Sequence, residues 1–189
     1  MINRRTMLKS ATAALAAPVF AKSVSAQSVW PSRPVRVVVP YPPAGGADTT
    51  ARLLFTKLGE MWGQQFVIDN RGGAGGTIGT EQVAKAAADG YTIAWANLGP
   101  LAIGPTLYRK LGYDLFRDLA PVSQAASLPF VLFTSAVFAP NTVGELVAHA
   151  KARPGEINFG STGVGSGLHL IGELFKTQAG IHIVHVPYK

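Results

Sequence analysis

The chain of 189 residues contains no cysteine. Without thiols it has no disulfide, no thiolate zinc site and no cysteine nucleophile. Charged side chains are also scarce, at 14%, whereas hydrophobic residues make up 48%. This balance excludes a disordered or acidic-tail protein and predicts a globular chain with a hydrophobic core. At roughly 150 residues per domain, the length allows one domain, or one domain and part of a second.

The sequence has little excess charge once its first residues are set aside. The formal net charge is +7, but the first 26 residues contain four basic residues and no acidic one: Arg4, Arg5, Lys9 and Lys22. The rest of the chain contains 13 basic and 10 acidic residues. We therefore expect no nucleic-acid partner, because such binding depends on a concentrated basic surface.

The sequence also lacks a hydrophobic run long enough to span a membrane. The uncharged stretch 11–21 is much shorter than the roughly 20 residues that a spanning helix needs. A basic start, this apolar stretch and Val24-Ser25-Ala26 predict a signal peptide over 1–26; a membrane-anchoring helix is the alternative. Arg4-Arg5 resembles a twin-arginine signal, and general secretory export stays open. We expect a periplasmic mature chain without membrane insertion.

Apolar strands alternate with glycine-bearing loops and helices along the rest of the chain. This order predicts an α/β protein with a mostly parallel sheet that is covered on both faces. The alternation falters near Pro121, so we expect a first domain over 27–124 and a partial second domain over 125–189. Thr142 and Glu145 predict a capping box. The predicted strands are 35–40, 65–69, 91–96, 130–134, 157–159 and 181–189, and the predicted helices include 77–88 and 142–153. Because the chain stops on a predicted strand, we treat it as a fragment.

Common catalytic and metal-binding patterns are missing. No Gly-Lys pair is present, so there is no P-loop, and no serine occupies the centre of a Gly-x-Ser-x-Gly elbow. His182 and His185 are three apart in a predicted strand, which places them on opposite faces and prevents chelation of one metal. We therefore expect no catalytic residue, no metal and no cofactor.

Glycine-bearing loops that precede helices are the strongest remaining feature. In an open parallel sheet, ligands bind where the strands end and these loops begin. The unpaired N–H groups and the dipole of a helix N-terminus favour a small anion there. Gly45 and Gly46 have no side chain to block such an anion. Glycine corners also occur in α/β proteins for geometric reasons alone, so this pattern leaves a purely structural role open.

Six blocks of sequence together resemble the Bug/TctC-type family of extracytoplasmic solute receptors, which are associated with tripartite tricarboxylate transporters. The resemblance covers nearly all of the chain after the predicted signal peptide. The blocks are VRVVVPYPPAGGADTTAR (35–52), DNRGGAGGTIG (69–79), DGYT (89–92), YD with DLAPV (113–114 and 118–122), GSTGVGSGLHL (160–170) and HVPYK (185–189).

This resemblance implies a type II periplasmic binding protein, or Venus flytrap, with two βα domains of which the second is incomplete here. Such a receptor captures a small organic carboxylate between its domains, for a transporter or a sensor. It implies a monomer that is not an enzyme, with membrane permease subunits as possible partners. The alternative is an exported α/β enzyme acting on a carboxylate or ester. The sequence does not specify which acid is bound.

The resemblance also implies the ligand-binding residues. They lie in one loop of each domain and in a third loop: Tyr41, Ala44, Gly45, Gly46, Asp48, Asn97, Ser161, Thr162, Gly165, Ser166 and His169. Ala44 departs from the glycine found in many relatives, which makes its amide a weaker candidate for ligand contact. Asp48 is interpreted as the N-cap of the first helix, and ligand contact is its lesser role. Arg71 is interpreted as an exposed surface residue, with electrostatic help to ligand binding as the alternative.

Overall fold

The computed structural model describes residues 30–188, so the predicted signal peptide at 1–26 lies outside the described residues. From Arg33 onward the described residues form one compact unit that contains two parallel sheets. The first sheet has the order β2-β1-β3, and the second pairs β4 with β5. The strands are β1 (Val35–Val39), β2 (Phe66–Asn70), β3 (Thr92–Ala94), β4 (Asn158–Ser161) and β5 (Val184–Pro187).

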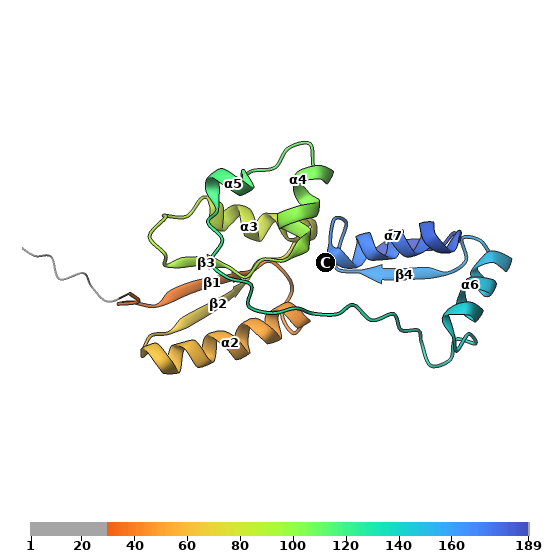
Figure 1. The fold of residues 1–189 in the computed structure, drawn as a ribbon, viewed down its shortest axis with the longest axis horizontal. Helices are drawn as coiled ribbons and strands as arrows, with labels where there is room; N and C mark the ends of the chain where they lie inside the picture. Colours follow the sequence, from red (N-terminus) through yellow and green to blue (C-terminus); the bar gives the residue numbers. More distant parts are fainter. Residues whose placement is uncertain (1–29, 189) are drawn as a thin grey trace, which may run out of the picture. The chain divides into compact units, whose positions relative to one another are not determined.

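Helices follow the strands in the predicted alternation. Helices α2 and α3 lie on opposite faces of the first sheet, so the central strand β1 is covered on both sides (Figure 1). The longer helices are α2 (Gly46–Trp62), α3 (Thr77–Ala84), α6 (Val143–Ala152) and α7 (Gly167–Ala179). The shorter ones are η1 (Ala74–Gly76), η2 (Gly99–Ile103), α4 (Gly104–Leu107) and α5 (Leu115–Asp118).

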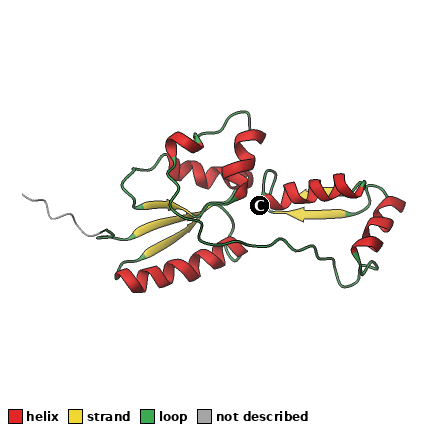
Figure 2. Cartoon of the chain, in the orientation of Figure 1, coloured by secondary structure: helices red, strands yellow, loops and turns green. Residues whose placement is uncertain are grey.

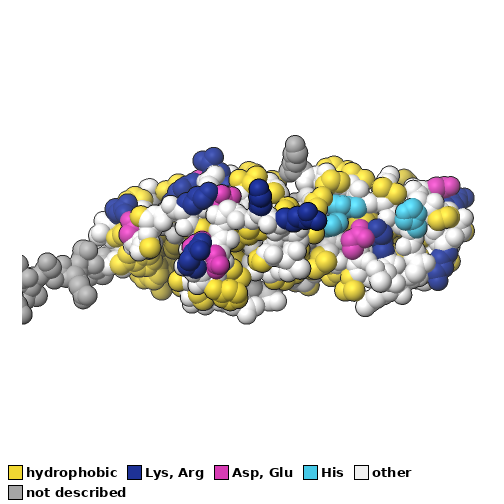
Figure 3. Space-filling model, turned by 90° about the horizontal axis from the view of Figure 1, so that it is seen from above, with side chains coloured by type: hydrophobic (Ala, Val, Ile, Leu, Met, Phe, Trp, Pro, Cys, Tyr) yellow, Lys and Arg dark blue, Asp and Glu magenta, His cyan; other side chains and the backbone are white. Residues whose placement is uncertain are grey.

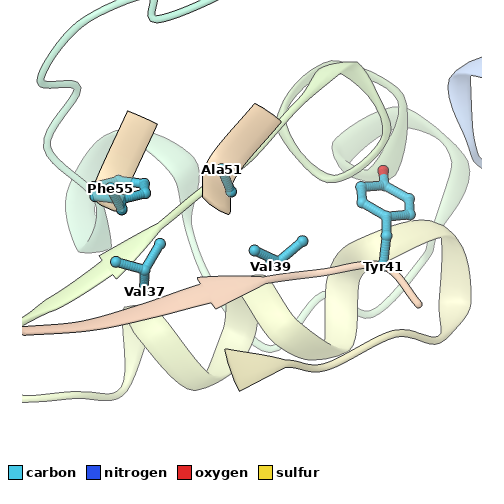
Figure 4. Packing of buried hydrophobic residues seen from close by; sticks show 5 residues of the cluster. All are labelled: Val37, Val39, Tyr41, Ala51 and Phe55. Atoms are coloured by element: carbon cyan, nitrogen blue, oxygen red, sulfur yellow. The ribbon is translucent and has the colours of Figure 1, made fainter. Parts of the chain in front are cut away.

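The first core forms between β1 and α2. Val37 and Val39 are fully buried and, with Tyr41, point to the side of the sheet on which Ala51 and Phe55 lie (Figure 4). Burying a valine side chain contributes about 1.5–3 kcal/mol. The four buried valines of β1 therefore fit a central strand, and they fix the position at which the chain leaves the sheet after Val39.

A second core lies under α6 and the chain that enters β5. Ala150, Ile181 and Ile183 are buried there. The predicted capping box is partly confirmed, because the Thr142 hydroxyl accepts a hydrogen bond from the N–H of Glu145 at 3.2 Å. The reciprocal bond differs from the prediction: the Glu145 carboxylate accepts from the N–H of Asn141 at 2.7 Å, one residue before the cap.

The predicted strand at 130–134 is wrong. No helix or strand occurs over 119–135, which runs as an irregular segment (Figure 2). Its large apolar side chains are exposed, with Val131 71% and Phe133 85% accessible. A strand requires a hydrogen-bonding partner, and β4 and β5 pair only with each other among the described residues. The predicted helix 77–88 is also too long, since α3 ends at Ala84.

Candidate functional site

The first corner is the loop 40–45 between β1 and α2, and a buried carboxylate organises it. Asp48 is 3% exposed, and its carboxylate accepts the N–H of Ala44 at 2.8 Å. It also accepts from Arg52 Nε at 3.0 Å and from Asn70 Nδ2 at 3.0 Å. These bonds, led by that from Arg52, lower the pKa of Asp48 from 3.8 to about 2 despite its burial. Asp48 is therefore ionised at neutral pH.

The prediction of Asp48 as the N-cap is wrong in position. The N-cap of α2 is Gly45, which has no side chain, and Asp48 lies in the first turn. From there its carboxylate reaches back to Ala44, whose φ of 65° is unfavourable for a residue with a side chain. Asp48 thus holds the loop before α2, but it does so from inside the helix.

The bond to Asp48 also changes what this corner offers a ligand. The Ala44 N–H is already donated within the protein, whereas helix geometry leaves the first N–H groups of α2 without an intrahelical acceptor. Gly45 and Gly46 are exposed, and the nearest atom to a Cβ added at either position would lie at 3.8 Å. This end of α2 therefore presents unpaired amides in open space, which suits an anion.

Tyr41 links the first corner to the loop after β3. Its hydroxyl lies 2.5 Å from Asn97 Oδ1 and 3.2 Å from the Gly75 carbonyl, so its single proton has two acceptors. Asn97 Oδ1 also accepts the N–H of Gly99 at 3.2 Å. Tyr41 is 7% exposed, and burial raises the pKa of its phenol to about 12. Its hydroxyl therefore stays protonated and donates to the loops that contain Asn97 and Gly75.

Three glycines bring three loops into contact. A Cβ atom on Gly99 would lie 2.5 Å from the Gly75 carbonyl oxygen and 3.2 Å from the Gly165 carbonyl oxygen. A Cβ atom on Gly75 would lie 2.7 Å from the Val164 carbonyl oxygen. The Tyr108 hydroxyl donates to that same Val164 oxygen at 2.9 Å. Only residues without side chains allow this approach of backbone to backbone.

The loop between β4 and α7 is held by its own hydroxyls. Ser166 is the N-cap of α7, and its Oγ accepts the N–H of His169 at 3.2 Å. The Ser161 Oγ accepts the N–H of Gly163 at 3.2 Å. Both serines are buried, at 5% and 1% exposure for Ser161 and Ser166, whereas Thr162 is exposed. These hydrogen bonds therefore fix the shape of the loop that leads into the N-terminus of α7.

Two histidines lie against this loop. The rings of His169 and His185 stack with centroids 4.1 Å apart. His169 Nδ1 accepts the N–H of Gly165 at 3.3 Å, and His185 Nε2 lies 2.6 Å from Ser161 Oγ. Burial, and then the charge of His169, lower the pKa of His185. The Gly165 amide is thus donated within the protein, as is that of Ala44.

The structure joins some predicted site residues and separates others. Tyr41, Asn97 and Gly165 belong to the contacts around Gly99. Gly45 and Gly46 instead lie near Pro42 and Leu128 respectively.

His185 was not among the predicted site residues. Its contact with Ser161 follows from the parallel pairing of Phe159 with His185, because Ser161 lies two residues after Phe159 on the same strand face. The sequence does not specify the register of this pairing, so it contained no signal for His185. His182, in contrast, is exposed and precedes β5.

One groove among the described residues is lined by side chains between Leu101 and Phe116, including Tyr108 and Arg109. It borders the loop between β4 and α7, because the Tyr108 hydroxyl donates to the Val164 carbonyl. Another groove is lined by Phe55, Gly59 and Phe66. Within residues 30–188, no group of three or more histidine, aspartate or glutamate side chains is placed to hold a metal ion. No helix in the same range is long and apolar enough to cross a membrane.

Comparison with known proteins identifies close similarities. The family model described as the tripartite tricarboxylate transporter family receptor, TctC, matches residues 50–189. Protein BugT of Bordetella pertussis is 43% identical over 180 residues, which cover 95% of this chain and 53% of BugT. The chain spans about half the length of the curated relatives it matches.

Two solved structures from Rhodopseudomonas palustris also match. Rpa4515 with adipate has a TM-score of 0.82 and 42% identity, over 85% of this chain and 54% of that one. MatC with bound malate has a TM-score of 0.78 and 31% identity, over 84% of this chain and 54% of that one. Further matching structures are described as periplasmic proteins, which confirms the predicted α/β fold class of periplasmic binding proteins. The chain belongs to the TctC family of tripartite tricarboxylate transporter receptors.

Proposed function

We propose that this chain binds a small organic dicarboxylate as part of a periplasmic receptor for a tripartite tricarboxylate-type transporter or a sensor. The observation that carries the proposal is its match, over 85% of its length, to the Rhodopseudomonas palustris protein with adipate. The match to a second relative with bound malate supports the same ligand class. The amide-rich ends of α2 and α7 supply the chemistry that this class requires.

In this proposal, main-chain amides grip a carboxylate and no arginine is needed. Gly46 and Ala47 at the start of α2, and Gly167 and Leu168 at the start of α7, provide the N–H groups. A hydrogen bond to a charged group contributes about 1.5–3 kcal/mol. Four such bonds can therefore supply the roughly 8 kcal/mol of micromolar binding, before the entropic costs of binding are deducted. Asp48 and Tyr41 hold the first corner in shape, and Ser161, Ser166 and His169 hold the loop between β4 and α7. Asn97 supports the loop after β3.

The proposed mechanism is capture, closure and delivery, with no bond made or broken. We assign 27–124 to a first domain and 125–189 to part of a second, so that the two corners belong to different domains. A ligand that contacts both domains favours the closed state by its difference in affinity for the closed and open states. Permease subunits in the membrane are the proposed recipients, and the receptor is proposed to be a monomer exported by a twin-arginine or general secretory signal.

The receptor interpretation is preferred to an exported enzyme. The family to which the chain belongs consists of receptors. Among residues 30–188, the contact between Ser161 Oγ and His185 Nε2 is the arrangement that resembles an activated nucleophile. The ring of His185 stacks on His169 and contacts the tilted ring of Phe159, and no carboxylate in the described residues bonds its other nitrogen as a triad requires. We therefore assign no catalytic residue.

The test is a thermal-shift screen of the purified chain against adipate, malate and monocarboxylates of matched length. Each hit is then measured by calorimetry, and the ligand is recovered and weighed by mass spectrometry. The proposal expects saturable binding of a dicarboxylate at one site with the ligand recovered unchanged. Absence of binding to every organic acid, or conversion of the acid to a product, contradicts it.

A further inference from the structure

We propose that His169 is a positioning residue that holds the 161–166 loop in its binding shape while its ring is neutral, and that proton uptake releases this loop. The inference rests on the proposed function of the loop. It assigns a role to the contacts that connect His169 and His185 with the amides of Gly165 and Gly163. The binding of a carboxylate does not itself require these contacts.

The loop is anchored at two points through the histidines. His169 accepts the N–H of Gly165 directly, and His185 contacts Ser161, which in turn accepts the N–H of Gly163. Both glycines have positive φ, 107° at Gly163 and 81° at Gly165. Residues with a side chain rarely adopt these conformations, so the loop has an unusual shape that these hydrogen bonds maintain.

The bond to Gly165 fixes the proton of the neutral His169 ring. Because Nδ1 uses its lone pair to accept the N–H, the ring proton must lie on Nε2. Nε2 faces Glu173 Oε1 at 3.9 Å, and Lys176 Nζ holds both oxygens of Glu173 at 2.9 and 2.8 Å. Histidine, acidic and basic side chains lie next to one another on the face seen in Figure 3.

A second proton therefore has opposite consequences at the two rings. At His169 it must enter at Nδ1, which removes the acceptor of the Gly165 N–H. At His185 it is tolerated, since Nε2–H donates to Ser161 Oγ while the serine hydroxyl turns to the Gly163 carbonyl at 3.2 Å. His169 is thus the member of the pair whose protonation releases the loop.

The charges around the pair limit it to one proton. Stacked rings with centroids 4.1 Å apart repel strongly when both are cationic. Lys176 disfavours a proton on His185 and Glu173 favours it, and burial is the largest effect lowering the pKa of His185. The remaining neighbours named by the contacts, Ser161 and Phe159, carry no charge. Release of the loop therefore follows a single protonation event at this pair.

The test compares His169→Asn, His169→Ala and the matched control His182→Asn. The asparagine oxygen takes the place of Nδ1 as an acceptor but does not titrate, whereas alanine removes the acceptor. In the ligand-free chain, we expect the Gly165 amide resonance to shift between pH 8 and 5 in the wild type and in His182→Asn, following the His169 ring. In His169→Asn it is independent of pH. A Gly165 amide that shifts equally in wild type and His169→Asn overturns the inference.

Binding of adipate at pH 8 and pH 6 provides the functional readout. We expect His169→Ala to weaken binding about fivefold at pH 8, as the loss of one hydrogen bond predicts, and His169→Asn to recover most of this loss. Wild type and His182→Asn weaken on going to pH 6, and His169→Asn does not. Tighter binding of the wild type at pH 6 contradicts the inference. If wild type binds no dicarboxylate, the proposed function fails, and the amide titration still decides the role of His169.

Discussion

At the scale of single residues, Asp48 stabilises the first corner through its hydrogen bonds. Its carboxylate receives the Ala44 N–H, the Arg52 side chain and the Asn70 amide, all at 3.0 Å or less. An aspartate shortly after a glycine pair could be predicted to cap the first helix, and it does bind the loop. Its place inside the helix could not be predicted, because the start of α2 at Gly46 depends on where the buried β1 leaves the sheet.

We expect Asp48→Ala to lower the free energy of unfolding at pH 7 by about 2 kcal/mol. The substitution removes the acceptor of the Ala44 N–H and of one Asn70 N–H, while the other Asn70 N–H still donates to the Tyr41 carbonyl. A donor left unpaired costs about 1–3 kcal/mol, and water that takes the place of the carboxylate recovers part of this. Urea denaturation of wild type and variant measures the difference. A difference below about 0.5 kcal/mol contradicts the role assigned to Asp48, since surface substitutions reach that size.

The same carboxylate predicts a pH dependence. Folding lowers the pKa of Asp48 from 3.8 to about 2, so its stabilisation is complete above about pH 4 and is lost as the pH falls towards 2. The stability of Asp48→Asn lacks this contribution. We expect the gap in unfolding free energy between wild type and Asp48→Asn to shrink from pH 5 to pH 2. A gap that stays constant over this interval contradicts the assigned charge state.

Gly46 tests the proposed grip on the ligand without disturbing the fold. A Cβ atom there would meet only Leu128, at 3.8 Å, so Gly46→Val is expected to fold. Its branched side chain occupies the space in front of the first amides of α2 and is expected to reduce adipate affinity at least tenfold by calorimetry. Gly144→Val, in the first turn of α6, places the same side chain at an equally open position and serves as the control.

Arg71 provides a second comparison for this experiment. Its side chain is about half exposed and pairs with Asp69 at 2.8 Å. We expect Arg71→Ala to change adipate affinity less than about threefold, because a surface charge acts through water. Loss of binding in Arg71→Ala, together with normal binding in Gly46→Val, reverses the proposed roles of side chain and backbone.

At the scale of elements, glycine sets how closely the loops approach. The sequence predicted glycine corners after strands, and the structure adds the reason for Gly75 and Gly99, whose backbones contact other loops. Those contacts join positions far apart in the chain, so spacing along the sequence contains no signal for them. The same limit explains the wrong strand at 130–134, where apolar residues were present but a pairing strand was not.

We expect Gly99→Ala to lower the unfolding free energy by about 1–3 kcal/mol, the range for overpacked sites. The added Cβ atom would lie 2.5 Å from the Gly75 carbonyl oxygen, and a backbone atom does not move aside as the end of a flexible side chain does. Gly144→Ala, with its nearest atom at 4.0 Å, is the control and is expected to be neutral or stabilising. Equal stability of the two variants in urea contradicts the close packing of these loops.

At the scale of the whole molecule, composition and alternation were enough for the fold class. The β-loop-α order predicted the parallel sheets, and the structure places the valine-rich strand β1 at the centre of the first one. The pairing of His169 with His185 depends on the register between β4 and β5, which the sequence does not specify. The comparisons then place the chain in a receptor family, with relatives that extend over about twice its length.

The most direct measurement of the central claim is a titration of the isotope-labelled chain with adipate, followed through its backbone amide resonances. If the first amides of α2 and α7 bind the carboxylate, the largest shifts occur at Gly46, Ala47, Gly167 and Leu168, and they saturate together. Shifts that instead concentrate along the groove beside Arg109 and Phe116 contradict the account.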